Sequence, residues 1–227
     1  MKKKRIGMVI AVEFEPFKAA YGDPKETIKD KGYEISCYEK ENYELYVIPS
    51  GIGEVAAAAS TQYLIDKYHV EMILNYGVVG SLSEKLGHAL SCLVKEIVDY
   101  RFDTSAIDHV EIGRHIEFPS VVLTTDEALR KKALEVDPNI LEVRCASGDI
   151  FVDDPAEKKK IRDQFGADIC EMEAAGIYLT AHRNGVPALF FKVIADTLFG
   201  GAGEYQEKSR DAARDCVAIL ENVIANL

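Results

Sequence analysis

The chain has 227 residues, of which 48% are hydrophobic and 29% are charged, and its formal net charge at pH 7 is -11. This composition is typical of a soluble globular protein with one substantial core, so we expect a single domain over residues 1–227. The net negative charge argues against nucleic acid as a partner, because a nucleic-acid-binding surface requires clustered basic residues. No stretch approaches the roughly 20 apolar residues of a membrane-spanning helix, so we expect no membrane partner either.

Predicted strands and helices alternate along most of the chain. Apolar, β-rich runs predict strands over residues 5–11, 33–38, 43–49, 71–76, 92–99, 140–145, 167–170 and 186–194. Helical patterns predict helices over residues 16–21, 54–68, 125–136, 155–165, 174–183 and 207–227. This alternation favours a mostly parallel sheet that is covered by helices, and we see no internal repeat.

The N-terminal part carries a basic run and then an acidic turn. We interpret Lys2-Lys3-Lys4-Arg5 as a solvated leader, because no cleavage pattern of a signal peptide follows the apolar stretch behind it. Glu13 and Glu15 lie on the turn between the first strand and the first helix. Each could simply be an acid that a helix start favours.

Glycines follow two of the predicted strands. Ser50-Gly51-Ile52-Gly53 precedes an alanine-rich helix, and Gly77 and Gly80 follow the strand over residues 71–76. Glycines at such positions let the backbone approach a ligand and leave N–H groups free. The alternative at Gly51 and Gly53 is a tight turn with close helix–sheet packing.

The middle of the chain contains a long polar connection, residues 100–118, about as long as connections become before they suggest a function. Thr124 or Thr125 is the expected cap of the helix that follows. Asp154 is the expected cap of the charged helix over residues 155–165, which begins with a proline.

The stretch Cys170-Glu171-Met172-Glu173-Ala174-Ala175-Gly176 joins a short apolar strand to a helix. Ligands of open α/β sheets bind at the carboxyl ends of strands, so a polar site is expected here. In an extended segment Glu171 and Glu173 point to one side and Met172 to the other. The alternative is that these acids only favour the start of the helix.

Asp196 follows the last apolar strand, and its nearest basic neighbour in the sequence is Lys192. The glycine-rich segment 198–203 is expected to be a mobile loop, and an amphipathic helix closes the chain. Polar or glycine residues thus follow most of the predicted strands, and we expect them to gather along one edge of the sheet. They are Glu15, Gly51, Gly53, Gly77, Gly80, Asp149, Glu171, Glu173 and Asp196, together with the aromatic Phe151.

The cysteines and histidines give no metal or disulfide pattern. Five cysteines, an odd number, are spread along the chain without Cys-x-x-Cys spacing, and the five histidines form no His-x-x-x-His pair. We therefore expect buried free thiols in a reducing compartment, the cytoplasm, and no metal.

Several of these segments together resemble a known family. Residues 7–15, Ser50–Gly53 with the alanines at 56–58, 77–80, 147–151, 171–174 and 194–196 are similar to successive motifs of the 5′-methylthioadenosine/S-adenosylhomocysteine nucleosidases. That family belongs to the nucleoside phosphorylase superfamily. The resemblance implies a three-layer α/β/α sandwich with a mixed, mostly parallel central sheet. It also implies a homodimer in which one subunit's irregular loop helps to close the other's pocket, and a place in methionine salvage.

The resemblance assigns roles to polar residues. Asp196 matches the general acid that protonates N7 of the purine, and Glu15 matches the carboxylate that activates water. Glu173 matches the acceptor of the ribose hydroxyls, and Glu171 is a further substrate-binding candidate. This chemistry suits the residue types, since a departing purine needs a proton and a positioned acid or base contributes ~10²–10⁴-fold. No cofactor is needed.

The remaining matches concern the base, the sugar and the 5′ group. Phe151 matches an aromatic that stacks on adenine, the backbone at Val152 would read the base edge, and Met172 would pack on the sugar. Val12 and Ile52 match residues that line the 5′-substituent pocket. The chain departs from the family at four positions. Lys192 stands where the family usually has an arginine, Val78 and Ala195 stand where it has serines, and Tyr76 stands where a small hydroxyl residue is common.

Three functions stay open at this point. The first is hydrolysis of methylthioadenosine-type nucleosides to release the base. The second is a sister activity, either a phosphorylase or a nucleosidase of the futalosine type, and the third is nucleoside binding without catalysis. Glu13 and Glu15 stand where the phosphorylases carry a Gly-Asp-Pro-x-Arg-like loop, and acids there would repel phosphate. Lys192, expected beside Glu15, is better suited to holding water or pairing with that carboxylate.

Overall fold

The computed structural model describes residues 3–227, so Lys2 of the basic leader lies outside the described part. The strands are β1 (Lys4–Ile10), β2 (Glu26–Asp30), β3 (Tyr33–Glu39), β4 (Tyr43–Pro49), β5 (Met72–Ser81), β6 (Ser91–Asp99), β7 (Leu123–Thr124), β8 (Leu141–Ser147), β9 (Ile169–Glu171) and β10 (Ala188–Asp196). The helices are α1 (Phe14–Tyr21), α2 (Glu54–Tyr68), α3 (Ser105–Asp108), α4 (Glu127–Val136), α5 (Pro155–Phe165), α6 (Ala174–Arg183), α7 (Gly201–Asp215) and α8 (Val217–Asn226).

All the strands belong to one mixed sheet. Its centre is a parallel run in the order β4-β1-β5-β10, and the predicted hairpin β3-β4 extends it on one side. On the other side β6, β8 and β9 lead from β10 back to β5, so this half of the sheet curls into a closed ring. The edge strand β2 was not predicted, because its largely exposed polar sequence lacks the apolar run of a buried strand.

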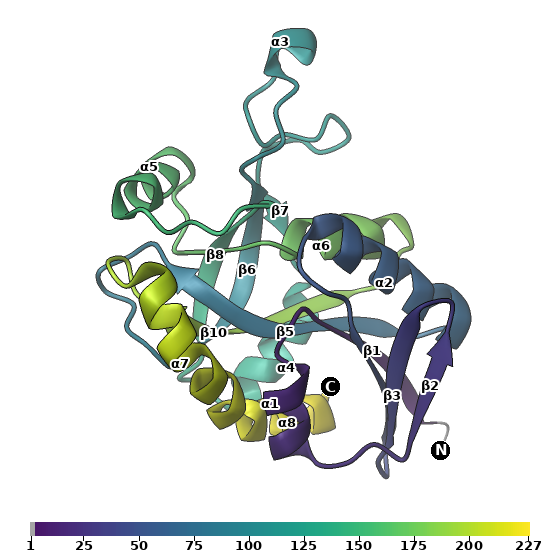
Figure 1. The fold of residues 1–227 in the computed structure, drawn as a ribbon. Coiled ribbons are helices and arrows are strands. Elements are labelled where there is room, and N and C mark those ends of the chain that lie inside the picture. The colour runs from purple at the N-terminus through teal and green to yellow at the C-terminus, as the bar shows by residue number, and fades with distance from the viewer. Residues whose placement is uncertain (1–2) are drawn as a thin grey trace.

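Helices cover both faces of the sheet (Figure 1). Helices α2 and α6 lie side by side on one face, and α1, α4, α7 and α8 pack on the other. Successive residues of β1 enter opposite cores, since Val9 belongs to one buried cluster and Ile10 to the other. A Cβ at Gly176 would lie 2.4 Å from the Glu54 carbonyl oxygen, so the close packing of α2 on α6 requires a glycine there. The expected layered fold with a mixed sheet is confirmed.

The predicted C-terminal helix is two helices, α7 and α8, which meet at Cys216. The reason lies in the core: the buried Tyr76 hydroxyl donates to the carbonyl oxygen of Ala213. In an unbroken α-helix that oxygen would accept the amide of Val217, four residues on. The apolar stripe continues across the break, which is why the sequence pattern predicts one helix. The first turn of α7 also occupies part of the expected glycine-rich loop.

Two other boundaries differ from the prediction. Strand β5 does not end before Gly77 but continues through Gly80 to Ser81, buried along its whole length. Helix α4 is capped by Asp126, whose side chain accepts the Leu129 amide at 2.9 Å. The hydroxyl of Thr125, a predicted cap, donates instead to the Val94 carbonyl. The cap at Asp154 is confirmed by its bond from the Ala156 amide.

The predicted irregular connection forms an arm that projects from one end of the sheet and carries α3, at the top of Figure 1. All five cysteines are buried and free, as expected. No helix within residues 3–227 combines the length and apolar character needed to cross a membrane.

Candidate active site

A cavity of about 280 Å³ opens where β1 and β10 end on either side of β5. Its lining consists of Ala11, Val12, Glu13, Ile52, Val78, Val79, Gly80, Phe151, Cys170, Glu171, Met172, Glu173, Asp196 and Tyr205. The predicted convergence of strand ends therefore exists. Of the residues predicted to act in catalysis or to bind the substrate, all but Glu15, Val152 and Lys192 line the cavity. Four further residues expected at this edge also lie outside the lining: Gly51, Gly53, Gly77 and Asp149.

The acid on the β1 side of the cavity is Glu13, whereas Glu15 is exposed on α1. The placement of Glu15 in the site is therefore wrong. Helix α1 begins at Phe14, two residues before the predicted start, and this carries Glu15 away from the strand end. The Glu13 carboxylate accepts the amides of Val78 and Val12, each at 3.0 Å.

Asp196 lies on the β10 side of β5 and is 1% exposed. The β10–β5 register shifts between Ile194 and Asp196, and such bulges re-aim side chains next to active sites. A Cβ at Gly80 would lie 3.1 Å from Asp196 Oδ2, so a glycine in β5 leaves room for the carboxylate.

Asp196 is not the lone carboxylate that the sequence suggests. The ammonium of Lys158, a fully buried residue of α5, donates to Asp196 Oδ2 at 2.5 Å and to the Thr197 carbonyl at 2.8 Å. Burial raises the pKa of Asp196 above its ordinary value, and the pairing with Lys158 opposes this. The arrangement suits a carboxyl that has to hold and then release a proton.

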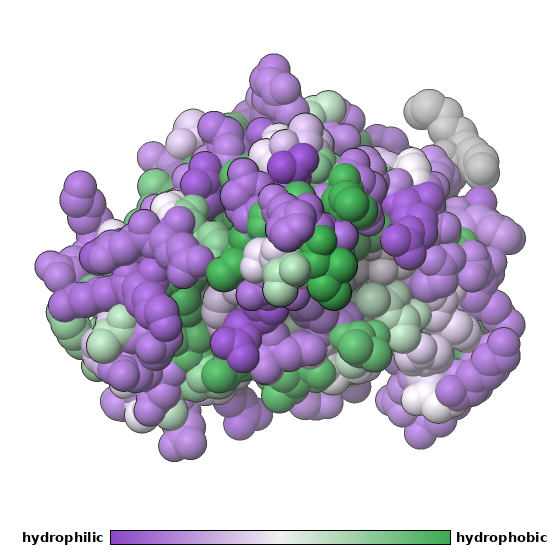
Figure 2. Space-filling view, turned by 90° about the horizontal axis from the view of Figure 1, so that it is seen from above, coloured by the Kyte–Doolittle hydropathy of each residue, from purple (hydrophilic) through white to green (hydrophobic). Residues whose placement is uncertain are grey.

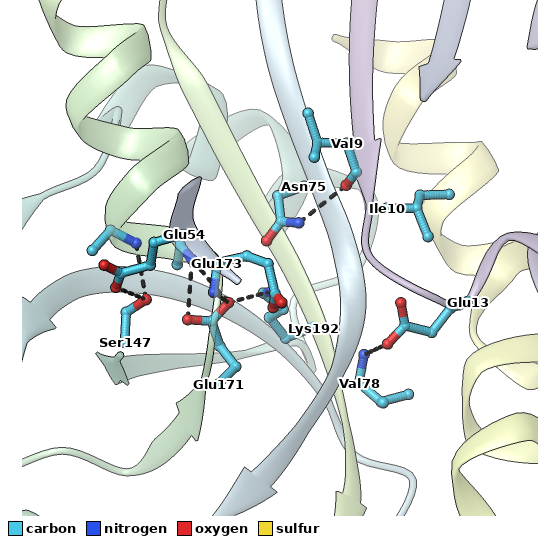
Figure 3. A network of polar contacts seen from close by, with 12 residues as sticks. Val9, Ile10, Glu13, Glu54, Asn75, Val78, Ser147, Glu171, Glu173 and Lys192 are labelled. Carbon is cyan, nitrogen blue, oxygen red and sulfur yellow. Dashed lines mark hydrogen bonds and ion pairs between the residues drawn. The ribbon is translucent and has the colours of Figure 1, made fainter. Parts of the chain in front are cut away.

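Glu171 has a structural role as well as a place in the lining. It accepts the amides of Glu173 and Ala174 at the start of α6, so the interpretation as a helix-start acid is correct for this residue. Lys192 Nζ lies 3.0 Å from Glu171 Oε2, and both side chains are buried (Figure 3). Lys192 therefore pairs with Glu171, and its expected place beside Glu15 is wrong.

Glu173 lies between this ion pair and the first turn of α2. Its Oε1 accepts the amide of Gly53 at 2.9 Å. Burial and the neighbouring Glu171 carboxylate raise the pKa of Glu173 to about 7, against the attraction of Lys192. Close by, the hydroxyl of Ser147 donates to Glu54 at 3.1 Å (Figure 3), and burial raises the pKa of Glu54 to about 8.

Aromatic and aliphatic side chains form the rest of the lining. The ring of Phe151 meets that of Tyr205, from the N-terminal part of α7, edge to face at a centroid distance of 5.4 Å. Met172 also lines the cavity, because the chain bends after β9 and does not stay extended. Val152 is buried and lines a neighbouring cavity behind Phe151, so its backbone contact with a base stays a prediction.

Sequence reasoning missed Glu13, Tyr205 and Lys158. Tyr205 falls just after the segment expected to be a loop, and nothing marks it. Lys158 did leave a signal, since it lies on the same face of α5 as the buried Ile161 and Phe165, at helical spacing. A lysine on an apolar stripe indicates a buried charge with a partner.

The lining brings together the parts that cleavage of a glycosidic bond requires. Two acids, Glu13 and Asp196, flank β5, and Glu173 can accept hydrogen bonds from hydroxyl groups. Aromatic rings provide a surface for a flat base. Among residues 3–227 we find no group of three or more His, Cys, Asp and Glu arranged to hold a metal.

Comparison with known proteins gives a consistent result. A family model described as "Phosphorylase superfamily" matches residues 6–225. The chain is 32% identical over 194 residues to the aminodeoxyfutalosine nucleosidase of Campylobacter jejuni, covering 80% of this chain and 81% of that protein. It is 30% identical over 200 residues to the 5′-methylthioadenosine/S-adenosylhomocysteine nucleosidase of Bacillus thuringiensis, covering 86% and 84%.

Solved structures from Helicobacter pylori are similar over the whole chain. The futalosine hydrolase superposes with a TM-score of 0.92 at 27% identity, covering 99% of this chain and 98% of that chain. The 5′-methylthioadenosine/S-adenosylhomocysteine nucleosidase, in complex with a substituted pyrrolidin-3-ol, superposes with a TM-score of 0.93 at 26% identity, and the match covers 100% of each chain.

Proposed function

Because the chain belongs to the phosphorylase superfamily, we propose that it is a purine nucleosidase that hydrolyses the N-glycosidic bond of 5′-methylthioadenosine or S-adenosylhomocysteine. The observation that carries the proposal is the placement of Asp196 and Glu13 on the two sides of β5, in one cavity with Glu173.

Asp196 is the general acid. When the bond between C1′ and N9 breaks, its electron pair goes to the base, and the proton of Asp196 goes to N7. Glu13 orients a water molecule, accepts one of its protons as the oxygen bonds to C1′, and so completes the hydrolysis. Glu13 takes the role that the family resemblance assigned to Glu15, because Glu13 is the acid that lines the cavity on the β1 side.

The other lining residues hold the nucleoside in place. Glu173 accepts hydrogen bonds from the 2′- and 3′-hydroxyls, and Met172 packs on the sugar. Phe151 stacks on the adenine, and Val12 and Ile52 border the 5′ group. The mechanism uses only protein carboxyl groups and water, so we assign no cofactor.

A nucleosidase of the futalosine type is the second candidate. Similarity to the aminodeoxyfutalosine nucleosidase of Campylobacter jejuni supports it as strongly as similarity to the methylthioadenosine enzymes supports the first. The two substrates differ in the 5′ group, which lies near the most exposed part of the lining, Val12 and Ile52. The two functions share the acid, the water and the sugar contacts.

The test measures free adenine by chromatography after incubation with methylthioadenosine, S-adenosylhomocysteine and aminodeoxyfutalosine in turn. We expect adenine release from at least one of the three nucleosides. The kcat/KM values then show which 5′ group the enzyme prefers. Binding of these nucleosides without release, with thermal stabilisation of the protein, would instead support a non-catalytic binding protein.

We further propose that the protein is a homodimer in which the arm of one copy covers the cavity of the other. Apolar side chains on the arm and around the cavity mouth are largely exposed: Ile107 80%, Ile116 68%, Ile52 60% and Val12 51%. Figure 2 looks onto this end of the molecule, where hydrophobic residues gather near the centre of a largely hydrophilic face. Light scattering of wild type and of Ile107→Glu tests this, and a monomeric wild type would contradict it.

The cytoplasm is the proposed location. Five buried free thiols support it, because proteins of oxidising compartments usually pair their cysteines.

A further inference from the structure

A lysine with no exposed surface is paired with the proposed general acid. Lys158 is 0% exposed and Asp196 is 1% exposed, and the two come from different elements, α5 and the end of β10. Removing two charges from water is costly unless their geometry is good, and a pair of well-packed apolar residues would usually be as stable. The pair therefore calls for an explanation beyond stability.

We propose that Lys158 is a positioning residue for catalysis: its ammonium fixes the Asp196 carboxyl by one oxygen and stabilises the carboxylate that remains after the proton has left. This inference rests on the proposed function, because it takes Asp196 as the acid.

The geometry leaves one carboxyl oxygen for the substrate. Lys158 donates to Asp196 Oδ2, and its second bond, to the Thr197 carbonyl at 2.8 Å, fixes the ammonium itself. Within residues 3–227 no hydrogen bond reaches Asp196 Oδ1. Asp196 lines the cavity, so Oδ1 is the oxygen available to carry the proton to N7.

The groups around Asp196 raise its pKa, and the positive charge of Lys158 opposes this effect. Glu204 of α7 and Asp153, which precedes α5, act together with burial to raise the pKa of Asp196. Tyr205 and the buried thiol of Cys170 also lie close, and burial raises the pKa of each to about 12, so both stay neutral near pH 7. Lys158 opposes this acidic environment. Without it, Asp196 would hold its proton too firmly to give it up to the purine.

The contribution of Lys158 grows along the reaction. Before proton transfer the ammonium faces a neutral carboxyl, and after it the ammonium faces a full negative charge. An interaction that is stronger in the transition state than in the ground state raises kcat, whereas one that is equal in both only lowers KM. Lys158 is therefore expected to act on kcat.

The test compares Lys158→Met with Lys160→Met, which removes an exposed lysine from the same helix. We expect Lys158→Met to lower kcat for base release by about tenfold or more with little change in KM. The alkaline limb of its kcat–pH profile should move up by at least about one pH unit, since a nearby cation normally favours the ionised carboxyl. Lys160→Met should match wild type.

Lys158→Arg keeps the charge, and we expect its alkaline limb to stay near that of wild type. A purely structural lysine would lower thermal stability in both Lys158 variants and leave the alkaline limb in place. An unmoved limb in Lys158→Met, or an equal movement in Lys158→Arg, would overturn the proposal.

A second measurement separates this inference from the proposed function. Carboxyl carbon NMR follows the titration of Asp196, which is assigned by the signal missing from Asp196→Asn. We expect the titration to lie at higher pH in Lys158→Met than in wild type or Lys160→Met. If wild type released no base from any nucleoside, the proposed function would fail, while this titration would still decide whether Lys158 sets the proton affinity of Asp196.

Discussion

The amide of Val78 donates to Glu13 Oε1 at 3.0 Å and so connects the turn after β1 to the middle of β5. A Cβ at the preceding residue, Gly77, would lie 3.4 Å from the same oxygen, so the glycine lets the carboxylate lie against the strand (Figure 3). Gly80 does the same for Asp196 on the other side of β5. The two glycines thus make room for the two acids, and Val78 contributes its backbone where the family uses a serine side chain.

Replacing Glu13 and Glu15 separately tests which acid binds the water. We expect Glu13→Gln to slow base release by ~10²–10⁴-fold, because the amide cannot accept the proton of water. Glu15→Gln should keep nearly the wild-type rate, since Glu15 is exposed on α1. Steady-state rates with saturating nucleoside give the comparison. A large loss in Glu15→Gln with none in Glu13→Gln would restore the assignment made from the sequence.

Glu173→Gln should lower kcat/KM for ribosides far more than for 2′-deoxyribosides. A carboxylate that accepts from two hydroxyls loses charge-assisted hydrogen bonds worth about 1.5–3 kcal/mol. The 2′-deoxyriboside has already lost one of them, so its kcat/KM should fall less. Glu173→Gln keeps an oxygen that can accept the Gly53 amide, which limits structural damage. Equal losses on both sugars would show that Glu173 has only a structural role, as the acceptor of the Gly53 amide before α2.

The same variant should change how stability depends on pH. The pKa of Glu173 is raised from 4.5 to about 7 by burial and by Glu171, so the folded protein binds this proton more tightly than the unfolded chain does. The free energy of unfolding of wild type should therefore fall as pH rises from about 4.5 to 7, by up to ~1.4 kcal/mol per pH unit. Denaturant titrations of wild type and Glu173→Gln should diverge over this range, with the variant gaining relative stability.

A parallel trend of the two proteins from pH 4.5 to 7 would contradict the raised pKa of Glu173. Glu54 acts in the same direction, because burial raises its pKa to about 8, and its contribution is present in both proteins. The comparison therefore isolates the carboxyl of Glu173.

The layered fold and most of the cavity could be predicted from the sequence, because strand ends, glycines and acids follow local rules. Helix α6 and the acids before it lie where the pattern places them. The sequence pointed to Glu15 and the structure places Glu13 in the cavity, because α1 starts two residues earlier than predicted. This shift of the helix start moves the Glu15 side chain from the strand end to solvent. The Lys158–Asp196 and Lys192–Glu171 pairs join residues 38 and 21 positions apart. Proximity in the sequence therefore gave no indication of the first pair. In the second pair, Lys192 contacts Glu171 and not Glu15, beside which it was expected.

Asp196→Asn should abolish base release and also reduce stability. The rate should fall by at least ~10²-fold, because an amide has no acid proton to give. At a pH at which Asp196 is ionised, the variant leaves the ammonium of Lys158 buried without its carboxylate, and breaking such a pair typically costs about 3–5 kcal/mol. Chemical denaturation measures this. The double variant with Lys158→Met should recover part of the loss, whereas full stability in Asp196→Asn alone would mean that the pair does not form in solution.

The last prediction is that the reaction is hydrolysis and that phosphate does not accelerate it. A phosphorylase binds a phosphate dianion beside C1′, and arginines usually provide that site, since the guanidinium group matches phosphate oxygens. Among the described residues the cavity lining contains four carboxyl groups, those of Glu13, Glu171, Glu173 and Asp196, and no lysine or arginine. The two buried lysines nearby are already paired, Lys192 with Glu171 and Lys158 with Asp196. A dianion entering this cavity would meet the proposed base, Glu13, and no cation in the lining to balance its charge, whereas a neutral water can bind to Glu13. We therefore expect the free sugar as product, at the same rate in phosphate buffer and in phosphate-free buffer of equal ionic strength. Sugar 1-phosphate among the products, or a rate that rises with phosphate concentration, would replace the hydrolase with a phosphorylase.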